Sequence, residues 1–193
     1  MGKLVVSEFI SLDGVIEDPG GAEGTSFGGW AMRFPAPDGQ QFKFEELVAS
    51  DVQLLGRVTY QEFAAAWPAM EETTGEFGER MNGMPKVVVS TTLTEPTWKN
   101  TTVISEDVAD EVARLKERYA GDVLVAGSAT LAGFLREHDL VDEYRLMVHP
   151  VVLGSGKRLF AEAGDSTDLQ LVESRNVGPD VLLLVYRPVR AAD

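Results

Sequence analysis

Apolar and polar positions alternate in blocks that predict strands and helices in turn. The apolar run Leu4–Ile10 predicts a first strand that ends at Ser11-Leu12-Asp13-Gly14. The elements predicted after it are, in chain order, a helix at about 39–50, a strand at 52–55, a helix from 56 to about 67, a short helix within 71–83, strands at 86–90 and 101–104, a helix after 105, a strand at 123–126 and a helix from about 128 to 138.

Local signals mark several helix ends. Pro68 is expected to stop the second helix, because proline lacks the backbone donor that a helix interior needs. Ser105 is a candidate N-cap for the helix that presents Val108, Val112, Leu115 and Tyr119 on one face, and Gly121 is the expected stop.

The last third of the chain follows a different pattern. Residues 143–150, 168–176 and 180–188 read as extended segments, and Gly178-Pro179-Asp180 is the turn of a terminal hairpin. In the first of them Tyr144, Leu146 and Val148 alternate with Arg145, Met147 and His149. Strand–helix repeats followed by a hairpin predict an α/β fold with a mostly parallel core and an antiparallel edge. With 193 residues, we expect residues 1–193 to form a single domain.

Residues 17–39 are the longest irregular stretch. They contain several glycines and prolines but also Phe27, Trp30, Met32 and Phe34, which a purely solvated linker would not need. Long loops inside a domain are often functional, so we interpret this stretch as a lid or pocket wall; a disordered loop is the alternative.

Composition excludes more chemistry than it suggests. The chain has no cysteine and two distant histidines, so thiolate chemistry is impossible and a histidine-built metal centre is not expected. No apolar run approaches the ~20 residues that span a bilayer, and no signal-peptide cleavage pattern follows the first strand, so we expect a soluble, cytoplasmic protein without a membrane partner. The net charge of −14 argues against nucleic acid. It leaves room for a small phosphorylated ligand held by backbone amides.

Two junctions between a strand and a helix carry the candidate binding chemistry. At Gly56-Arg57-Val58-Thr59 a glycine ends a buried strand, and the helix start offers free amides to an anion. A capping box of Thr59 and Glu62 with a solvated Arg57 explains the same residues. At Gly127-Ser128-Ala129-Thr130 small residues permit close approach of a pyrophosphate, and an ordinary serine N-cap is the alternative.

A third junction, Ser90-Thr91-Thr92, adds hydroxyl groups after another strand. Ligands of open α/β sheets bind at the carboxyl ends of the strands, so the three junctions together predict a site for a phosphate-rich cofactor. This interpretation requires the two helix starts to converge on one pyrophosphate. Helix starts on opposite sides of the sheet, or a space between them filled by side chains, would contradict it.

These segments carry a family resemblance. The chain resembles the dihydrofolate reductase superfamily, and specifically the C-terminal reductase domain of the bifunctional deaminase-reductase of riboflavin biosynthesis. The landmarks that carry the resemblance are residues 11–14, 55–60, 87–90, 127–131, 140–146 and 149–160, the last reading His-Pro-Val-Val-Leu-Gly-Ser-Gly-Lys-Arg-Leu-Phe.

The resemblance implies a three-layer α/β/α, dihydrofolate-reductase-like fold with a sheet of about eight strands that binds NADPH across its carboxyl edge. It would place Gly56, Arg57 and Thr59 near the adenosine-side phosphates, and Ser90 and Thr91 near the ribose 2′-phosphate. Residues Gly127, Ser128, Ala129 and Thr130 would present helix-start amides to the pyrophosphate. It also implies a homodimer.

The chain departs from the family pattern in three places. The pterin-binding carboxylate of dihydrofolate reductases falls near Gln40, which cannot carry a negative charge. Thr91 stands where some members have a cation, which weakens a preference for NADP over NAD. There is no zinc motif, so the deaminase domain is missing.

The function we expect is NADPH-dependent reduction of a small heterocycle, as in 5-amino-6-(5-phosphoribosylamino)uracil reductase. The alternatives are a nucleotide-binding protein without turnover, and an enzyme of this fold acting on a pterin; a pure interaction protein would leave the glycine junctions without purpose. Asp13 is the candidate catalytic residue, as the acidic group expected nearest the substrate, although Leu-Asp-Gly is also a favoured turn and no general acid is evident. Trp30 and Trp67 are candidates for stacking on a heterocycle or for core packing, and His149 is expected to be structural.

Overall fold

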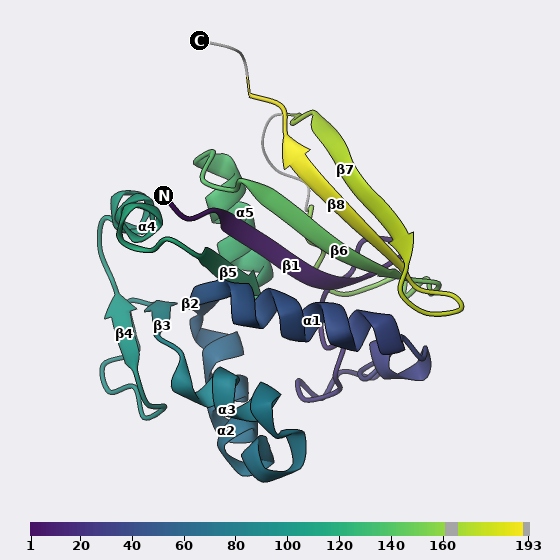
Figure 1. Ribbon diagram of the computed structural model, residues 1–193, viewed down its shortest axis with the longest axis horizontal. Helices are drawn as coiled ribbons and strands as arrows, with labels where there is room; N and C mark the ends of the chain where they lie inside the picture. Colours follow the sequence, from purple (N-terminus) through teal and green to yellow (C-terminus); the bar gives the residue numbers. More distant parts are fainter. Residues whose placement is uncertain (161–165, 191–193) are drawn as a thin grey trace.

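The computed structural model describes residues 1–160 and 166–190, which build one eight-stranded sheet (Figure 1). Its strands are β1 Leu4–Ser11, β2 Ser50–Gly56, β3 Lys86–Val89, β4 Thr101–Ile104, β5 Asp122–Ala126, β6 Glu143–His149, β7 Leu169–Asn176 and β8 Leu182–Pro188. Its helices are η1 Ala31–Arg33, a 3₁₀ turn, and α1 Pro37–Ala49, α2 Arg57–Thr74, α3 Glu76–Gly83, α4 Val108–Arg118 and α5 Ala129–Glu137. No helix of the described residues is long and apolar enough to cross a membrane.

The strand order is β4-β3-β2-β5-β1-β6-β8-β7. The first six of these strands run parallel, and β8 and β7 are antiparallel at one edge. The expected mostly parallel sheet with an antiparallel C-terminal hairpin is therefore confirmed.

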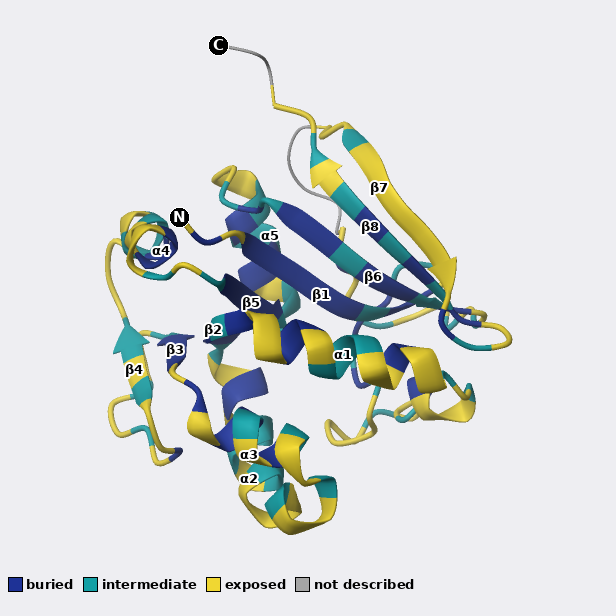
Figure 2. Cartoon of the chain, viewed as in Figure 1, coloured by how far each residue is buried: buried dark blue, intermediate teal, exposed yellow. Residues whose placement is uncertain are grey.

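Helices cover both faces of the sheet and make a three-layer structure. On one face Val5, Leu55 and Leu124 pack against helices α1 to α3. On the other face Val6 and Val125 belong to the cluster that includes the buried residues of α4 and α5. Figure 2 shows the central strands mostly buried and β7 mostly exposed. Residues on both faces of a central parallel strand are buried, which explains the near-continuous apolar runs in the sequence.

The alternation predicted for β6 separates two cores. Tyr144 and Leu146 belong to the core beneath α4 and α5. Met147 belongs to a smaller cluster with Leu183 and the partly buried Phe42 on the α1 side. Successive side chains of a strand point to opposite faces, and here both faces are covered.

Pro68 does not end the second helix, contrary to the prediction. Helix α2 continues through Pro68 to Thr74. The ring of Trp67 stacks on Phe77 of α3 with centroids 5.3 Å apart, and it meets Phe63 edge-on. This packing against α3 holds the helix together beyond the hydrogen bond that the proline removes.

Two cap predictions for α4 were also wrong. The N-cap is Asp107 in a left-handed conformation, with no hydrogen bond from its side chain, rather than Ser105. The C-cap is Tyr119, and Gly121 instead lies two residues further on, where its amide donates to Asp51 Oδ2 at 2.7 Å. A side chain at Gly121 would collide with the Ala49 carbonyl oxygen, so close packing explains this glycine.

Two buried residues, Asp18 and Trp30, attach the long irregular stretch at residues 17–39 to the rest of the fold. The carboxylate of Asp18 accepts the amides of Glu23 and Thr25 and the Thr25 hydroxyl. Trp30 is fully buried, donates its indole N–H to the Glu17 carbonyl at 2.8 Å and packs edge-on against His149. Trp30 and His149 are therefore core residues, and Trp30 does not offer a stacking surface.

Candidate functional site

The two glycine junctions, Gly56–Thr59 and Gly127–Thr130, meet at the carboxyl edge of the sheet. Strands β2 and β5 are neighbours, so the residues that follow them lie side by side. The Ser128 hydroxyl accepts the Gly56 amide at 2.9 Å and donates to the Thr59 hydroxyl at 2.8 Å. Thr59 thus bonds Ser128, and α2 has no side-chain cap, which excludes the capping box with Glu62.

Helices α2 and α5 nevertheless lie on opposite faces of the sheet. The prediction that both helix starts lie on one side of the sheet was therefore wrong. After β2 the chain crosses toward β3, and after β5 it crosses in the other direction toward β6. The two junctions thus flank a topological switch point, where the helix starts border a ligand site from both faces.

Backbone amides remain free at both helix starts. The amides of the two glycines are engaged, since Gly56 donates to Ser128 and Gly127 donates to Glu8 Oε2 at 3.1 Å. The first turns of α2 and α5 have no side-chain cap in the described residues. Among the described residues, the amides at 58–59 and 129–131 therefore remain without a partner and carry the positive end of each helix dipole, whereas the Arg57 amide faces the paired strand β3.

Gly127 is required by its conformation as well as by its surroundings. Its φ of +66° is left-handed, and a Cβ there would lie 3.0 Å from Thr59 Cγ2. Ser128 is also left-handed, with a φ of +68°. Two successive residues in this region are strained for L side chains, and such strain concentrates at functional sites.

The third junction reaches the same edge. Val89 pairs with Gly56 in the sheet, so Ser90 follows at the level of Arg57. The Ser90 hydroxyl accepts the amides of Thr92 and Leu93 and closes a turn, while Thr91 is exposed. Arg57 is exposed and donates to Gln61 one helical turn further on.

Glu8 is a residue that the sequence analysis missed. It lies in the middle of β1, is 4% exposed, and its Oε2 accepts the Gly127 amide. Its Oε1 is buried without a hydrogen bond. Burial raises the pKa of this carboxyl to about 8, and the Lys43 charge and the Gly127 amide lower it less than burial raises it. A buried carboxyl with a perturbed pKa at a ligand edge is a marker of function. Glu8 is an acidic residue inside a strand that is otherwise buried on both faces, and this pattern in the sequence could have identified it.

Asp13 joins two loops at the same edge. Its carboxylate accepts the Ser11 hydroxyl and the amides of Leu153 and Gly154, and it lies 3.6 Å from the Arg158 guanidinium. The hydrogen bond from Ser11, followed by those from the loop amides, lowers the pKa of Asp13 to about 2. A carboxyl group that is ionised at neutral pH cannot donate a proton, so these contacts favour the turn interpretation of Asp13.

The long loop also lies against α2. Burial raises the pKa of Glu62 in α2 to about 6, and the charges of Glu23 and Asp18 raise it further. A Cβ on Gly156 would touch the Phe27 ring at 3.0 Å, and Lys157 pairs with Glu17 at 2.7 Å. Residues 17–30 and 150–158 therefore lie together beside α2, and the function of the stretch 17–39 as a lid or pocket wall stays a prediction.

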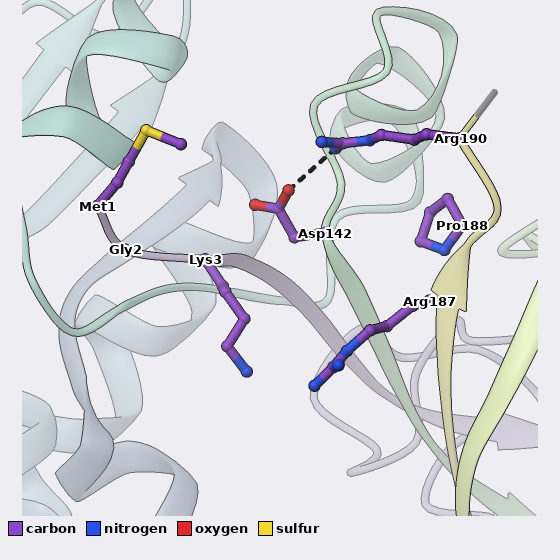
Figure 3. A pocket seen from close by; sticks show the side chains of 7 residues that line it. All are labelled: Met1, Gly2, Lys3, Asp142, Arg187, Pro188 and Arg190. Carbon is purple, nitrogen blue, oxygen red and sulfur yellow. Dashed lines mark hydrogen bonds and ion pairs between the residues drawn. The ribbon is translucent and has the colours of Figure 1, made fainter. Parts of the chain in front are cut away.

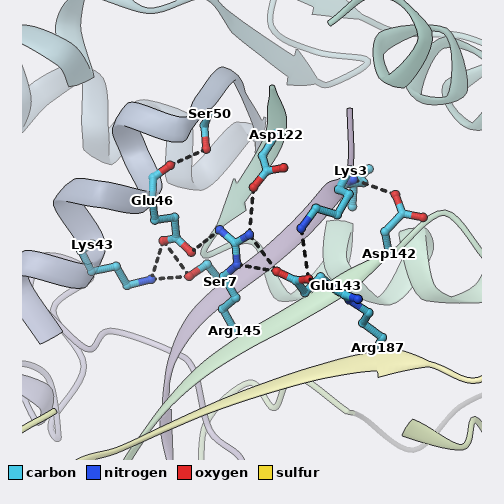
Figure 4. A network of polar contacts seen from close by, with 11 residues as sticks. Lys3, Ser7, Lys43, Glu46, Ser50, Asp122, Asp142, Glu143, Arg145 and Arg187 are labelled. Atoms are coloured by element: carbon cyan, nitrogen blue, oxygen red, sulfur yellow. Dashed lines mark hydrogen bonds and ion pairs between the residues drawn. The ribbon is translucent and has the colours of Figure 1, made fainter. Parts of the chain in front are cut away.

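The face of the sheet that α1 covers holds a charge network (Figure 4). The Arg145 guanidinium bonds the carboxylates of Glu46, Asp122 and Glu143. Glu46 also accepts the Ser7 hydroxyl, and its neighbour Lys43 lies 3.2 Å away. Buried charges that are paired in this way are a structural arrangement.

Two surface depressions lie away from the glycine junctions. One of about 410 Å³ is lined by the N-terminal residues together with Lys3, Arg187 and Arg190, and Figure 3 shows Arg190 paired with Asp142. The other, of about 390 Å³, lies between α2 and Trp98. Neither includes a predicted cofactor-binding residue. The basic side chains of the first are paired with Asp142 and Glu143.

Comparison with known proteins identifies the family. The family model of the RibD C-terminal domain matches residues 2–183, and the chain belongs to this family. The uncharacterized protein YwjB of Bacillus subtilis (strain 168) is 30% identical over 189 residues, which cover 96% of this chain and 98% of the relative.

Solved structures share the fold. A putative riboflavin biosynthesis protein from Shewanella sp. PV-4 superposes with a TM-score of 0.73 and 22% identity, over 98% of this chain and all of that one. Dihydrofolate reductase from Enterococcus faecalis, complexed with NADP(H), superposes with a TM-score of 0.58 and 15% identity, over 97% and 96% of the two chains. The protein has the dihydrofolate-reductase-like fold.

Proposed function

We propose that this protein is an NADPH-dependent reductase of a small heterocyclic substrate. The observation that carries the proposal is the meeting of two uncapped helix starts at one switch point, joined through the Ser128 hydroxyl. Membership of the RibD C-terminal domain family supports it, as does a fold shared with a reductase that binds NADP(H).

The residues of the two glycine junctions fit a dinucleotide. The free amides at 58–59 and 129–131 would bind the pyrophosphate, and Gly127 leaves room where any side chain would press on Thr59. Arg57 would add a positive charge, and Ser90 and Thr91 would lie beside the ribose phosphate on the neighbouring strand. The bound cofactor would supply the hydride, while the protein holds it against the substrate and excludes water.

A titration tests the proposal. NADPH and NADH are added separately and binding is followed by nicotinamide fluorescence. We expect NADPH to bind and Arg57→Ala to weaken it by about tenfold, since a hydrogen bond to a charged group contributes about 1.5 kcal/mol. Because Thr91 stands where some family members have a cation, we expect only a modest preference for NADPH over NADH. Absence of binding of either cofactor at millimolar concentration would overturn the proposal.

A nucleotide-binding protein without turnover is the second candidate, because the ionised Asp13 cannot act as the proton donor. The two functions differ in NADPH oxidation. Oxidation that depends on an added pyrimidine, pterin or flavin precursor supports the reductase, and binding without oxidation supports the second candidate.

A further inference from the structure

Glu8 lies where two strands of the sheet separate, between β1 and the Gly127 junction. The pairing of β1 with β5 ends at Ser7 and Ala126. Gly127, the residue that follows β5, donates its amide to the Glu8 side chain instead of to the backbone of β1. The carboxyl group of Glu8 therefore lies at the inner end of the site that we assign to the cofactor.

This carboxyl has an unmet hydrogen-bonding atom. Glu8 is 4% exposed, and Oε1 has no partner among the described residues. The charged groups nearest to it are Lys43 and Glu46 of α1, which bond each other and Ser7 on the far face of β1. Across β6, Arg145 is occupied by three carboxylates. Among the described residues, no cation forms an ion pair with Glu8.

The protonated form of Glu8 explains this geometry. Burial raises its pKa to about 8, so the neutral carboxylic acid prevails at pH 7. Because Oε2 accepts the Gly127 amide, the proton belongs on Oε1, which then becomes a hydrogen-bond donor without an acceptor. Native proteins seldom leave a buried donor unsatisfied.

We propose that Glu8 donates a hydrogen bond from Oε1 to a carbonyl oxygen of the ligand bound at the glycine junctions. This inference rests on the proposed function, which provides two sources of such a carbonyl: the carboxamide of the nicotinamide and a ring carbonyl of the heterocyclic substrate. Glu8 is in this account a binding residue that selects an uncharged acceptor. Its ionised form would turn two acceptor oxygens toward the same carbonyl and repel it.

Binding measurements on three ligands test the inference. By calorimetry we would measure NADPH, 2′-phospho-ADP-ribose, which has the same phosphates without the nicotinamide, and 5-amino-6-(5-phosphoribosylamino)uracil with NADP⁺ saturating to prevent turnover. Each is measured at pH 6.5 and 9.5. For the ligand whose carbonyl binds Glu8, we expect affinity to fall roughly 30-fold over this range, in proportion to the protonated fraction of a group with a pKa of about 8. The affinity for 2′-phospho-ADP-ribose should not show this fall with pH, because this ligand lacks the nicotinamide.

Two variants sharpen the result. Glu8→Gln accepts the Gly127 amide and donates at every pH, so we expect wild-type affinity at pH 6.5 and no loss at pH 9.5. Glu8→Ala removes the donor and weakens the carbonyl ligand about tenfold at pH 6.5. Glu137→Gln, an exposed glutamate at the end of α5, is the control and behaves as wild type. If Glu8→Ala does not fold, the pH dependence of ligand affinity in Glu8→Gln is by itself the test of the inference.

The outcomes separate the two proposals. An effect confined to NADPH or to the uracil supports the inference and names the source of the carbonyl. Wild-type binding of all three ligands by Glu8→Ala, or equal weakening of all three including 2′-phospho-ADP-ribose, overturns it, since Glu8 would then only shape the Gly127 turn. If the wild type binds none of them, the proposed function fails and the inference fails with it.

Discussion

The two faces of the parallel sheet differ in how they satisfy buried polar groups. On the face that α1 covers, Arg145 meets three carboxylates, and Glu143 is also bonded by Lys3 and Arg187. On the face that α4 and α5 cover, Glu8 has neither an ion pair nor a partner for Oε1 among the described residues. Unmet polar groups cost stability, so a fold keeps them where a ligand uses them. The difference distinguishes structural charges from a binding site.

Removing Arg145, the centre of the charge network on the α1 face, gives the largest expected effect. Arg145→Met leaves three carboxylates without their shared cation, and Glu46 and Glu143 are almost fully buried. We expect a loss of about 3–5 kcal/mol in the free energy of unfolding, measured by urea denaturation. Arg114→Met, at an exposed pair with Glu111, is the control and should change stability by less than about 0.5 kcal/mol. Equal stability of the two variants would contradict the structural role of the network.

The pH dependence of stability tests Glu8, the unpaired acid on the other face. Because the pKa of Glu8 rises from 4.5 to about 8 on folding, the folded protein holds a proton that the unfolded chain has released between these values. Glu8 therefore reduces stability progressively as pH rises from about 4.5 to 8. Glu8→Gln lacks this loss, so we expect it to gain about 2–4 kcal/mol over the wild type between pH 4 and pH 9. Parallel pH profiles of the two proteins would show that Glu8 ionises freely.

A smaller effect is expected where the glycine junctions touch. Gly127→Ala imposes a left-handed conformation on alanine and presses its Cβ against Thr59, which should cost about 1–2 kcal/mol and weaken NADPH binding at least tenfold. Gly133→Ala, inside α5 with nothing within 4 Å, is the matched control. It should stabilise the protein by about 0.5–1 kcal/mol and leave NADPH affinity unchanged. Unchanged NADPH affinity in Gly127→Ala would contradict the assigned site.

Local patterns in the sequence predicted the elements and the glycine junctions but not what they bond to. The order of strands and helices follows from periodicity, which is a local property. The contact of Ser128 with Gly56 depends on β2 and β5 being neighbours, which no local pattern contains. Pro68 was misassigned because the packing of α2 on α3 outweighs a local helix breaker. Glu8 could have been predicted, since a single acid in a doubly buried strand demands an explanation.

The most direct test of the account is a titration of the ¹⁵N-labelled protein with NADPH, followed through its backbone amide resonances. We predict the largest shifts at Arg57, Val58 and Thr59 together with Ala129 and Thr130, at a common saturation point. Shifts that instead concentrate at Lys3, Arg187 and Arg190 around the basic depression, or at one helix start without the other, would contradict a dinucleotide site between the glycine junctions.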